Sequence, residues 1–173
     1  MSKAFTKESD SEEEAALSRV TTLPNGARNY MTADGAERLR KQLETLVDQR
    51  TRLAEAGEGE IRRDELRRIT AQVQVIAQKL ADADVVALSE ANSGEVRFGM
   101  FVTLRDGDGA EDEYRIVGVD EVDFEPGWIS WLSPLARAVM GKRVGEVVQF
   151  HAPVGEKMLH ILAVRSPVAG SAG

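Results

Sequence analysis

The chain has 173 residues, a formal net charge of −7 and no cysteine. A chain of this length forms one ordinary domain or two small ones. Without cysteine, a disulfide framework, a thiolate metal site and a cysteine nucleophile are all excluded. The sequence contains no long apolar run and no signal-peptide pattern, so we expect a cytoplasmic protein that does not enter a membrane.

Negative charge is concentrated in the C-terminal half. Residues 91–173 carry 8 basic and 12 acidic side chains, which accounts for −4 of the total of −7. An acidic domain without a basic stripe is repelled by phosphate groups. We therefore expect no independent nucleic-acid binding and favour a protein partner.

Residues 1–31 are predicted to form a disordered acidic tail. The first 29 residues show no hydrophobic periodicity, and residues 9–14 (SDSEEE) form a charge run of low hydrophobicity. Residues 23–26 (LPNG) have the composition of a turn that ends this tail.

Residues 32–90 are predicted to form an antiparallel α-helical coiled-coil hairpin. Apolar residues recur at spacings of three and four on both sides of a turn that contains Gly57 and Gly59. Thr32 is a candidate N-cap for the first helix. The second arm, near residues 60–87, has a predicted length of roughly 40 Å. The apolar positions are Ala36, Leu39, Leu43, Leu46 and Leu53 in the first arm and Leu66, Ile69, Val73, Ile76, Leu80, Ala83 and Ala87 in the second.

One interior position of the first arm is charged. Arg50 falls on the apolar face, and two interpretations are open. Its aliphatic stem packs in the seam while its guanidinium reaches water, or it pairs with Asp64 or Glu65 and sets the register of the hairpin.

Residues 95–165 are predicted to form a small, mostly antiparallel sheet with one short helix, which makes the chain an α+β protein. The strand-like segments are residues 100–104, 114–119, 128–131, 147–150 and 158–164. Residues 106–109 (DGDG) are typical of a tight hairpin turn. Residues 166–173 are predicted to be a flexible C-terminus.

The predicted short helix has signals for both of its ends. Ser133 is an N-cap residue, Pro134 occupies the first helical position, and Gly141 supplies a left-handed stop.

Aromatic and histidine side chains also occur in the predicted strands. Trp128 and Trp131 are three residues apart on one strand, so we expect them on opposite faces, one in the core and one in an exposed contact patch. His151 and His160 are the only histidines, and without cysteine or suitably spaced carboxylates no zinc site is expected.

Residues 133–146 (SPLARAVMGKRVGE) closely resemble the C-terminal domain of the Gre transcript-cleavage factors, which act on bacterial RNA polymerase. Residues 32–43 resemble the start of the Gre coiled coil, residues 114–121 the central strand and residues 153–157 the closing hairpin. The resemblance spans residues 30–164, with the GreB branch nearer. It implies an FKBP-like fold for residues 95–165.

The resemblance further implies that the corner around the short helix binds RNA polymerase. Ser133, Pro134, Leu135 and Arg137 match the family pattern, whereas Leu132 stands where a GreB-like factor carries an acid. For Ser133 a purely structural role as a helix cap is the alternative.

At the hairpin tip, the family carries an aspartate and a glutamate that enter the polymerase through its secondary channel. There they help to bind a second Mg²⁺ and orient a water that cuts backtracked RNA. The family tip has two residues between its acids and an asparagine after the second. This chain has Glu58 and Glu60 only two positions apart, no following asparagine, and Asp64 one turn further on. The family pattern also implies that the coiled coil is shortened by several residues in each arm.

We therefore expect a monomeric elongation factor that binds RNA polymerase, has no resident cofactor and is not itself an enzyme. Weak or no stimulation of RNA cleavage is expected, and a cleavage-deficient competitor of Gre factors is one alternative. A prolyl isomerase or chaperone is another, because the FKBP-like fold also serves that role, although aromatic residues make up only 5% of the chain. A coiled-coil dimerisation protein is the third, but the glycine turn at residues 57–59 opposes it.

Overall fold

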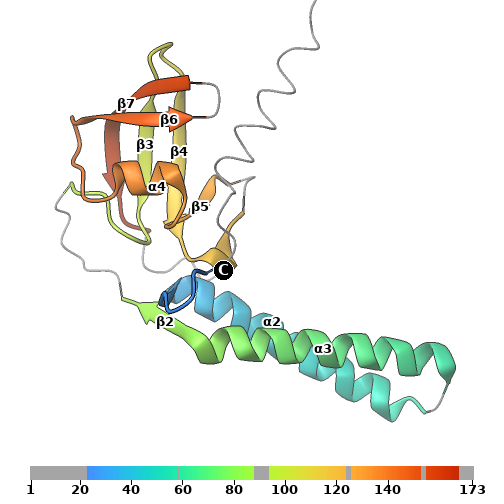
Figure 1. The fold of residues 1–173 in the computed structure, drawn as a ribbon. Helices are drawn as coiled ribbons and strands as arrows, with labels where there is room; N and C mark the ends of the chain where they lie inside the picture. The colour runs from blue at the N-terminus through green and yellow to red at the C-terminus, as the bar shows by residue number, and fades with distance from the viewer. Residues whose placement is uncertain (1–22, 58, 88–93, 124–125, 153–154, 168–173) are drawn as a thin grey trace, which may run out of the picture.

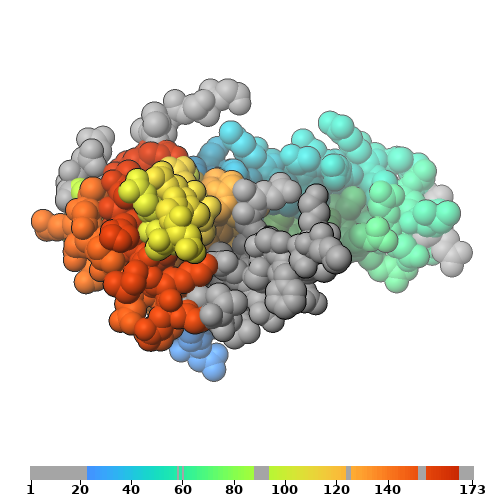
Figure 2. All heavy atoms as spheres, turned by 90° about the horizontal axis from the view of Figure 1, so that it is seen from above, coloured from blue at the N-terminus to red at the C-terminus, as the bar shows by residue number. Residues whose placement is uncertain are grey.

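The computed structural model describes residues 23–57, 59–87, 94–123, 126–152 and 155–167. These residues form two parts, a helical hairpin and a β domain from which the hairpin projects (Figure 1). Seen from above, the hairpin extends to one side of the β domain (Figure 2). The predicted α+β architecture is thus confirmed. Most of the predicted acidic tail, residues 1–22, and residues 168–173 of the predicted flexible C-terminus lie outside the described residues.

The hairpin consists of α2 (Ala33–Glu55) and α3 (Glu60–Asp82), each of 23 residues. At about 1.5 Å per residue each arm is about 35 Å long. The Thr32 side chain caps α2 by accepting a hydrogen bond of 3.0 Å from the Gly35 amide. Ile69 and Ile76 are buried in the seam. The predicted antiparallel hairpin and its glycine turn are confirmed.

Arg50 is half-buried along this seam. Its proposed partner Asp64 instead pairs within α3, where its Oδ1 lies 2.9 Å from Nη2 of Arg67. Among the described residues Arg50 forms no ion pair with Asp64 or with Glu65, which favours the first interpretation, a stem packed in the seam without a register-setting pair.

Two short strands at the base of the hairpin were not predicted. β1 (Asn29–Thr32) pairs in parallel with β2 (Ala83–Val86), and Met31 in β1 is fully buried. Two predictions are therefore wrong: the tail does not extend to residue 31, and the second arm ends at Asp82 rather than near residue 87. A strand of four residues is too short to show a hydrophobic period of two. In the sequence, Ala83 and Ala87 continue the helical spacing of the second arm, which is why the predicted helix is too long.

The β domain is a five-stranded sheet in the order β5-β4-β3-β7-β6. Neighbouring strands are antiparallel except β4 and β5, which are parallel. The helix α4 (Pro134–Val139) covers one face of the sheet (Figure 1), and the 3₁₀ helix η1 (Val119–Glu121) follows β4. The strands are β3 (Phe101–Arg105), β4 (Glu111–Val117), β5 (Trp128–Ser130), β6 (Val147–Ala152) and β7 (Gly155–Arg165).

An apolar core lies between this sheet and α4. Its members are buried side chains from the five strands of this sheet and from α4, together with Val96, which precedes β3. They are Val96, Val102, Leu104, Ile116, Ile129, Leu135, Ala136, Val139, Val148, Phe150, Leu159 and Ile161.

The end signals of α4 are confirmed. The Ser133 hydroxyl accepts a hydrogen bond of 3.2 Å from the Ala136 amide, Pro134 is the first helical residue, and Gly141 has φ +78° just beyond the C-cap. Among the helices that the structure describes, none is long and apolar enough to cross a membrane.

Candidate functional site

The hairpin tip is closed by an arginine that the sequence pattern did not indicate. Nη1 of Arg62 donates hydrogen bonds to the carbonyl oxygens of Ala56, at 2.6 Å, and Gly57, at 2.9 Å. These carbonyls lie at the C-terminal end of α2, where the last turn has no helical partners and carries partial negative charge. Gly57 makes the turn possible with φ +91°. Arg62 therefore joins the two helices at the tip.

Of the three acidic residues predicted at the tip, the structure describes the side chain of one. Glu58 lies outside the described residues, and Glu60 is the first residue of α3 with its side chain outside the description. Asp64 is exposed and paired with Arg67. Ile61, between Arg62 and Glu60, is 86% exposed. Among the described residues, no group of three or more histidine, aspartate or glutamate side chains is arranged to hold a metal ion.

The predicted polymerase-binding corner is half buried. Ser133 and Leu135 are 0% and 2% exposed, whereas Pro134 and Arg137 are exposed. The alternative role of Ser133 as a cap is the one that its geometry fulfils. Only Pro134 and Arg137 of the four present a surface, and the other two support that surface from within.

The prediction for the two tryptophans is confirmed only in part. Trp131 packs against the core, but neither tryptophan is in an exposed patch, because both are half-buried where the hairpin meets the β domain. The Trp131 ring is 5.1 Å from that of Tyr30, and the Trp128 ring lies under the guanidinium of Arg38 at 4.5 Å. Because β5 ends at Ser130, Trp131 is off the strand and the alternation of faces does not apply to it.

The contact between hairpin and β domain contains two buried charged side chains and a third, Asp120, that is partly buried. The first is Arg115 in β4, whose side chain is 3% exposed. It donates two hydrogen bonds to the Asp34 carboxylate in the first turn of α2, at 2.6 and 2.8 Å. Its Nε donates to the Gly99 carbonyl at 3.2 Å. The hydrogen bonds from Arg115 lower the pKa of Asp34 to about 2.

The second buried group is the Glu121 carboxylate in η1, with a side chain 2% exposed. Its Oε2 accepts hydrogen bonds from the amides of Thr32 at 2.9 Å and Gly118 at 3.0 Å. Its Oε1 accepts a hydrogen bond from the Thr32 hydroxyl and lies 3.6 Å from Nη2 of Arg38. A buried carboxylate is costly unless it has such donors. Glu121 thus anchors the residue that caps α2.

The third group reaches the other arm of the hairpin. Asp120 in η1 accepts from Asn29 at 3.1 Å and pairs with Nζ of Lys79 in α3 at 2.7 Å. The backbones approach so closely that a Cβ on Gly118 would overlap the carbonyl oxygen of Tyr30. Sequence reasoning missed these contacts because the paired residues are far apart in the chain and carry no local signature.

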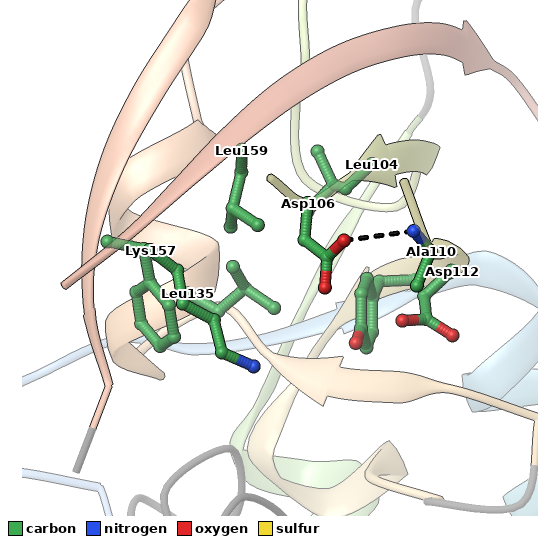
Figure 3. Close-up of a pocket in the computed structure, with 9 residues that line it drawn as sticks. Leu104, Asp106, Ala110, Asp112, Leu135, Lys157 and Leu159 are labelled. Carbon is green, nitrogen blue, oxygen red and sulfur yellow. Dashed lines mark hydrogen bonds between the residues drawn. The ribbon is translucent and has the colours of Figure 1, made fainter. Parts of the chain in front are cut away.

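A small cavity lies at the end of the β domain away from this contact, beside the turn that follows β3 (Figure 3). Asp106 closes the turn by accepting a hydrogen bond of 2.9 Å from the Ala110 amide, as the predicted turn at residues 106–109 requires. The cavity volume is about 30 Å³. Small-molecule sites have volumes of about 300–1,000 Å³, so this cavity does not favour the prolyl isomerase alternative. It is lined by Leu104, Asp106, Ala110, Asp112, Tyr114, Leu135, Phe150, Lys157 and Leu159.

Comparisons with known proteins agree with the motifs of the β domain. Residues 91–166 match the family model described as "Transcription elongation factor, GreA/GreB, C-term". GreA of Alkalilimnicola ehrlichii is 39% identical over 151 residues, covering 78% of this chain and 96% of that relative. GreB of Pseudomonas aeruginosa is 35% identical over 167 residues, covering 88% of this chain and 99% of that relative.

Two solved structures of transcription factors also match this chain. The GreA/GreB factor of Nitrosomonas europaea matches with 24% identity and a TM-score of 0.40, covering 80% of this chain and 98% of that one. A structure of the transcription factor Gfh1 matches with 26% identity and a TM-score of 0.41, covering 81% and 99%.

Proposed function

The chain belongs to the GreA/GreB family of transcription elongation factors, and we propose that it binds bacterial RNA polymerase as a monomer. The α2–α3 hairpin enters the secondary channel while the β domain remains outside. The observation that carries this proposal is the pair of equal helices, 23 residues each, that projects from a separately packed domain. One helical seam buries too little apolar surface to be a core, whereas an arm about 35 Å long is suited to reaching a distant site.

We propose that the tip acts by occupying the channel, with weak or no stimulation of RNA cleavage. Arg62 holds the turn by two hydrogen bonds, and Asp64 is paired with Arg67. The second contact places a cation beside Asp64, the one candidate tip acid whose side chain the structure describes. Ligation of Mg²⁺ requires near-ideal distances of about 2.0–2.1 Å, whereas steric occupancy of a channel tolerates larger errors. Any Mg²⁺ involved belongs to the polymerase, so the protein is an accessory factor without a cofactor of its own.

Docking of the β domain is assigned to Pro134 and Arg137. Both are exposed, Pro134 at the first position of α4 and Arg137 in its last turn, and the buried residues Ser133 and Leu135 fix the helix against the domain. An exposed proline on a rigid support loses little conformational entropy on binding, and the arginine adds charge and hydrogen-bond donors. This is the contact that we expect to place the hairpin at the channel entrance.

A cleavage assay with backtracked elongation complexes tests the proposal. We expect the protein to bind polymerase, to slow elongation and to leave the 3′ end of backtracked RNA intact. The variant with Glu58→Ala and Glu60→Ala should bind equally well and alter elongation only modestly. Robust Mg²⁺-dependent cleavage that is lost in this variant would overturn the occupancy mechanism. Absence of polymerase binding by the wild type would overturn the proposed function itself.

The same assay with backtracked elongation complexes distinguishes a competitor of Gre factors from a protein that acts on elongation directly. Adding the protein together with a cleavage-competent Gre factor measures whether it blocks the cleavage that the other factor stimulates. Inhibition that scales with polymerase occupancy supports the competitor role. An unchanged cleavage rate at saturating protein contradicts it.

A further inference from the structure

We propose that the polar contacts between the hairpin and the β domain, which centre on two buried charges, fix the direction in which the hairpin projects. These contacts, here called the joint, consist of Thr32, Asp34 and Lys79 on the hairpin and Arg115, Asp120 and Glu121 on the β domain. Asp34, Arg115 and Glu121 are therefore positioning residues. The inference rests on the proposed function only where it concerns RNA polymerase.

The joint holds both arms of the hairpin, which is what determines an orientation. Arg115 and Glu121 hold the start of α2, through Asp34 and Thr32, while Asp120 holds the end of α3 through Lys79. A hinge at one helix would leave the hairpin free to rotate about that helix. Contacts to two antiparallel helices from one short segment, residues 115–121, remove that rotation.

Burial makes other orientations costly. The side chains of Arg115 and Glu121 are 3% and 2% exposed, so a small rotation of the hairpin would separate these two charges from their partners before water could reach them. Removing one partner from a buried pair is strongly destabilising, because the other charge remains desolvated. Gly35 and Gly118 add steric selection, since a Cβ at either position would overlap the opposite part of the joint.

The length of the hairpin explains why its direction needs to be fixed. For an arm about 35 Å long, a tilt of about 10° at the joint displaces the tip by about 6 Å. That displacement is comparable to one helical turn, about 5.4 Å. A factor whose β domain docks outside a channel and whose tip acts inside it must therefore control this angle at the joint.

A distance measurement on the full chain tests the joint without polymerase. The sequence has no cysteine, so Arg63→Cys near the tip and Asp108→Cys in the β3–β4 turn accept spin labels at those two exposed sites alone. Pulsed electron paramagnetic resonance then gives the distance distribution between hairpin and β domain. We expect one narrow distribution in the otherwise unchanged protein, and a broadened or shifted one after Asp34→Asn or Glu121→Gln.

Two controls separate positioning from folding. Glu37→Gln removes a carboxylate from the same end of α2, but Glu37 pairs only within that helix, at 3.7 Å from Arg40, and the distribution should stay narrow. Thr32→Ser keeps the hydroxyl that meets Glu121 and should also stay narrow. Far-ultraviolet circular dichroism of all variants should retain the helical signal of the unchanged protein.

A broad distribution in the unchanged protein, or a narrow and unshifted one in both Asp34→Asn and Glu121→Gln, would overturn the inference. The elongation assay adds an independent readout. Loosened variants should keep polymerase affinity within about twofold, because Pro134 and Arg137 are untouched, but should lose most of their effect on elongation. If the distances change as expected and the wild type fails to bind polymerase, the joint stands and the proposed function fails.

Discussion

Replacing Gly118 by alanine is a direct test of the packing at the joint. Gly118 has φ −67° and ψ 162°, which alanine adopts without strain. The added Cβ would, however, overlap the Tyr30 carbonyl oxygen and lie 2.9 Å from Oε2 of Glu121 and 3.2 Å from the Tyr30 carbonyl carbon. Overpacking of this kind costs about 1–3 kcal/mol. Alanine also lowers the conformational entropy of the unfolded chain, which stabilises the folded protein by about 0.4–1 kcal/mol. We therefore expect the free energy of unfolding to fall by about 1–2 kcal/mol in total.

The assay for Gly118→Ala uses the native fluorescence of the protein. The chain has two tryptophans, and Trp128 and Trp131 both lie at the joint, packed against Arg38 and Tyr30. We expect a red-shifted emission in the native state and a lower free energy of unfolding in denaturant titrations. Gly107→Ala is the matched control, because a Cβ there meets nothing within 4 Å. If both variants show the emission and stability of the wild type, the close packing argued for the joint is refuted.

Three further outcomes are expected. Arg62→Ala should increase amide hydrogen exchange at the C-terminal end of α2, because it removes the hydrogen bonds to the carbonyls of Ala56 and Gly57. Arg63→Ala is the control, and equal exchange in both variants would contradict the role of Arg62. Ser133→Ala should lower the free energy of unfolding by about 1 kcal/mol through loss of the α4 cap. Pro134→Ala with Arg137→Ala should instead weaken polymerase binding. If Ser133→Ala weakens binding and the double variant changes only stability, this corner is not part of the interface. Because Arg115 lowers the pKa of Asp34 from 3.8 to about 2, the stabilisation from this pair should be complete above pH 3.8 and lost as the pH falls toward 2. Urea titrations across that range should show that the free energy of unfolding depends less on pH in Asp34→Asn than in the wild type. The same pH dependence in both proteins would count against the pair.

Local signals predicted the elements that are determined locally. Ser133, Pro134 and Gly141 mark both ends of α4 because capping and the left-handed stop depend on neighbouring residues alone. The glycine turn and the helical spacings likewise predicted the hairpin. Thr32 was predicted as the cap of α2, but its second role as a partner of Glu121 requires knowledge of a residue 89 positions away.

The residues that join the two parts were not predictable in this way. Asp34 was interpretable as an ordinary first-turn acid, and Arg115 as a charge within a strand motif. Their contact spans 81 positions and exists only after both parts have folded. The tryptophans show the same limit, since Tyr30 in β1 and Arg38 in α2, both distant in the sequence, form part of their environment.

The chemistry of the joint is better suited to selecting one geometry than to adding stability. The pair of buried Arg115 with half-exposed Asp34 contributes little net stability, because solvent screens its attraction and desolvation of the arginine offsets much of the rest. An apolar interface of equal area would hold the hairpin at least as firmly. An apolar interface, however, remains favourable after small rotations, whereas the paired hydrogen bonds from Arg115 to Asp34 are lost when the carboxylate turns. The donors on Glu121 impose a second directional requirement at the same helix end. Because a small rotation at the base of the hairpin causes a large displacement of its tip, directional contacts at the base are the arrangement that keeps the tip in one place.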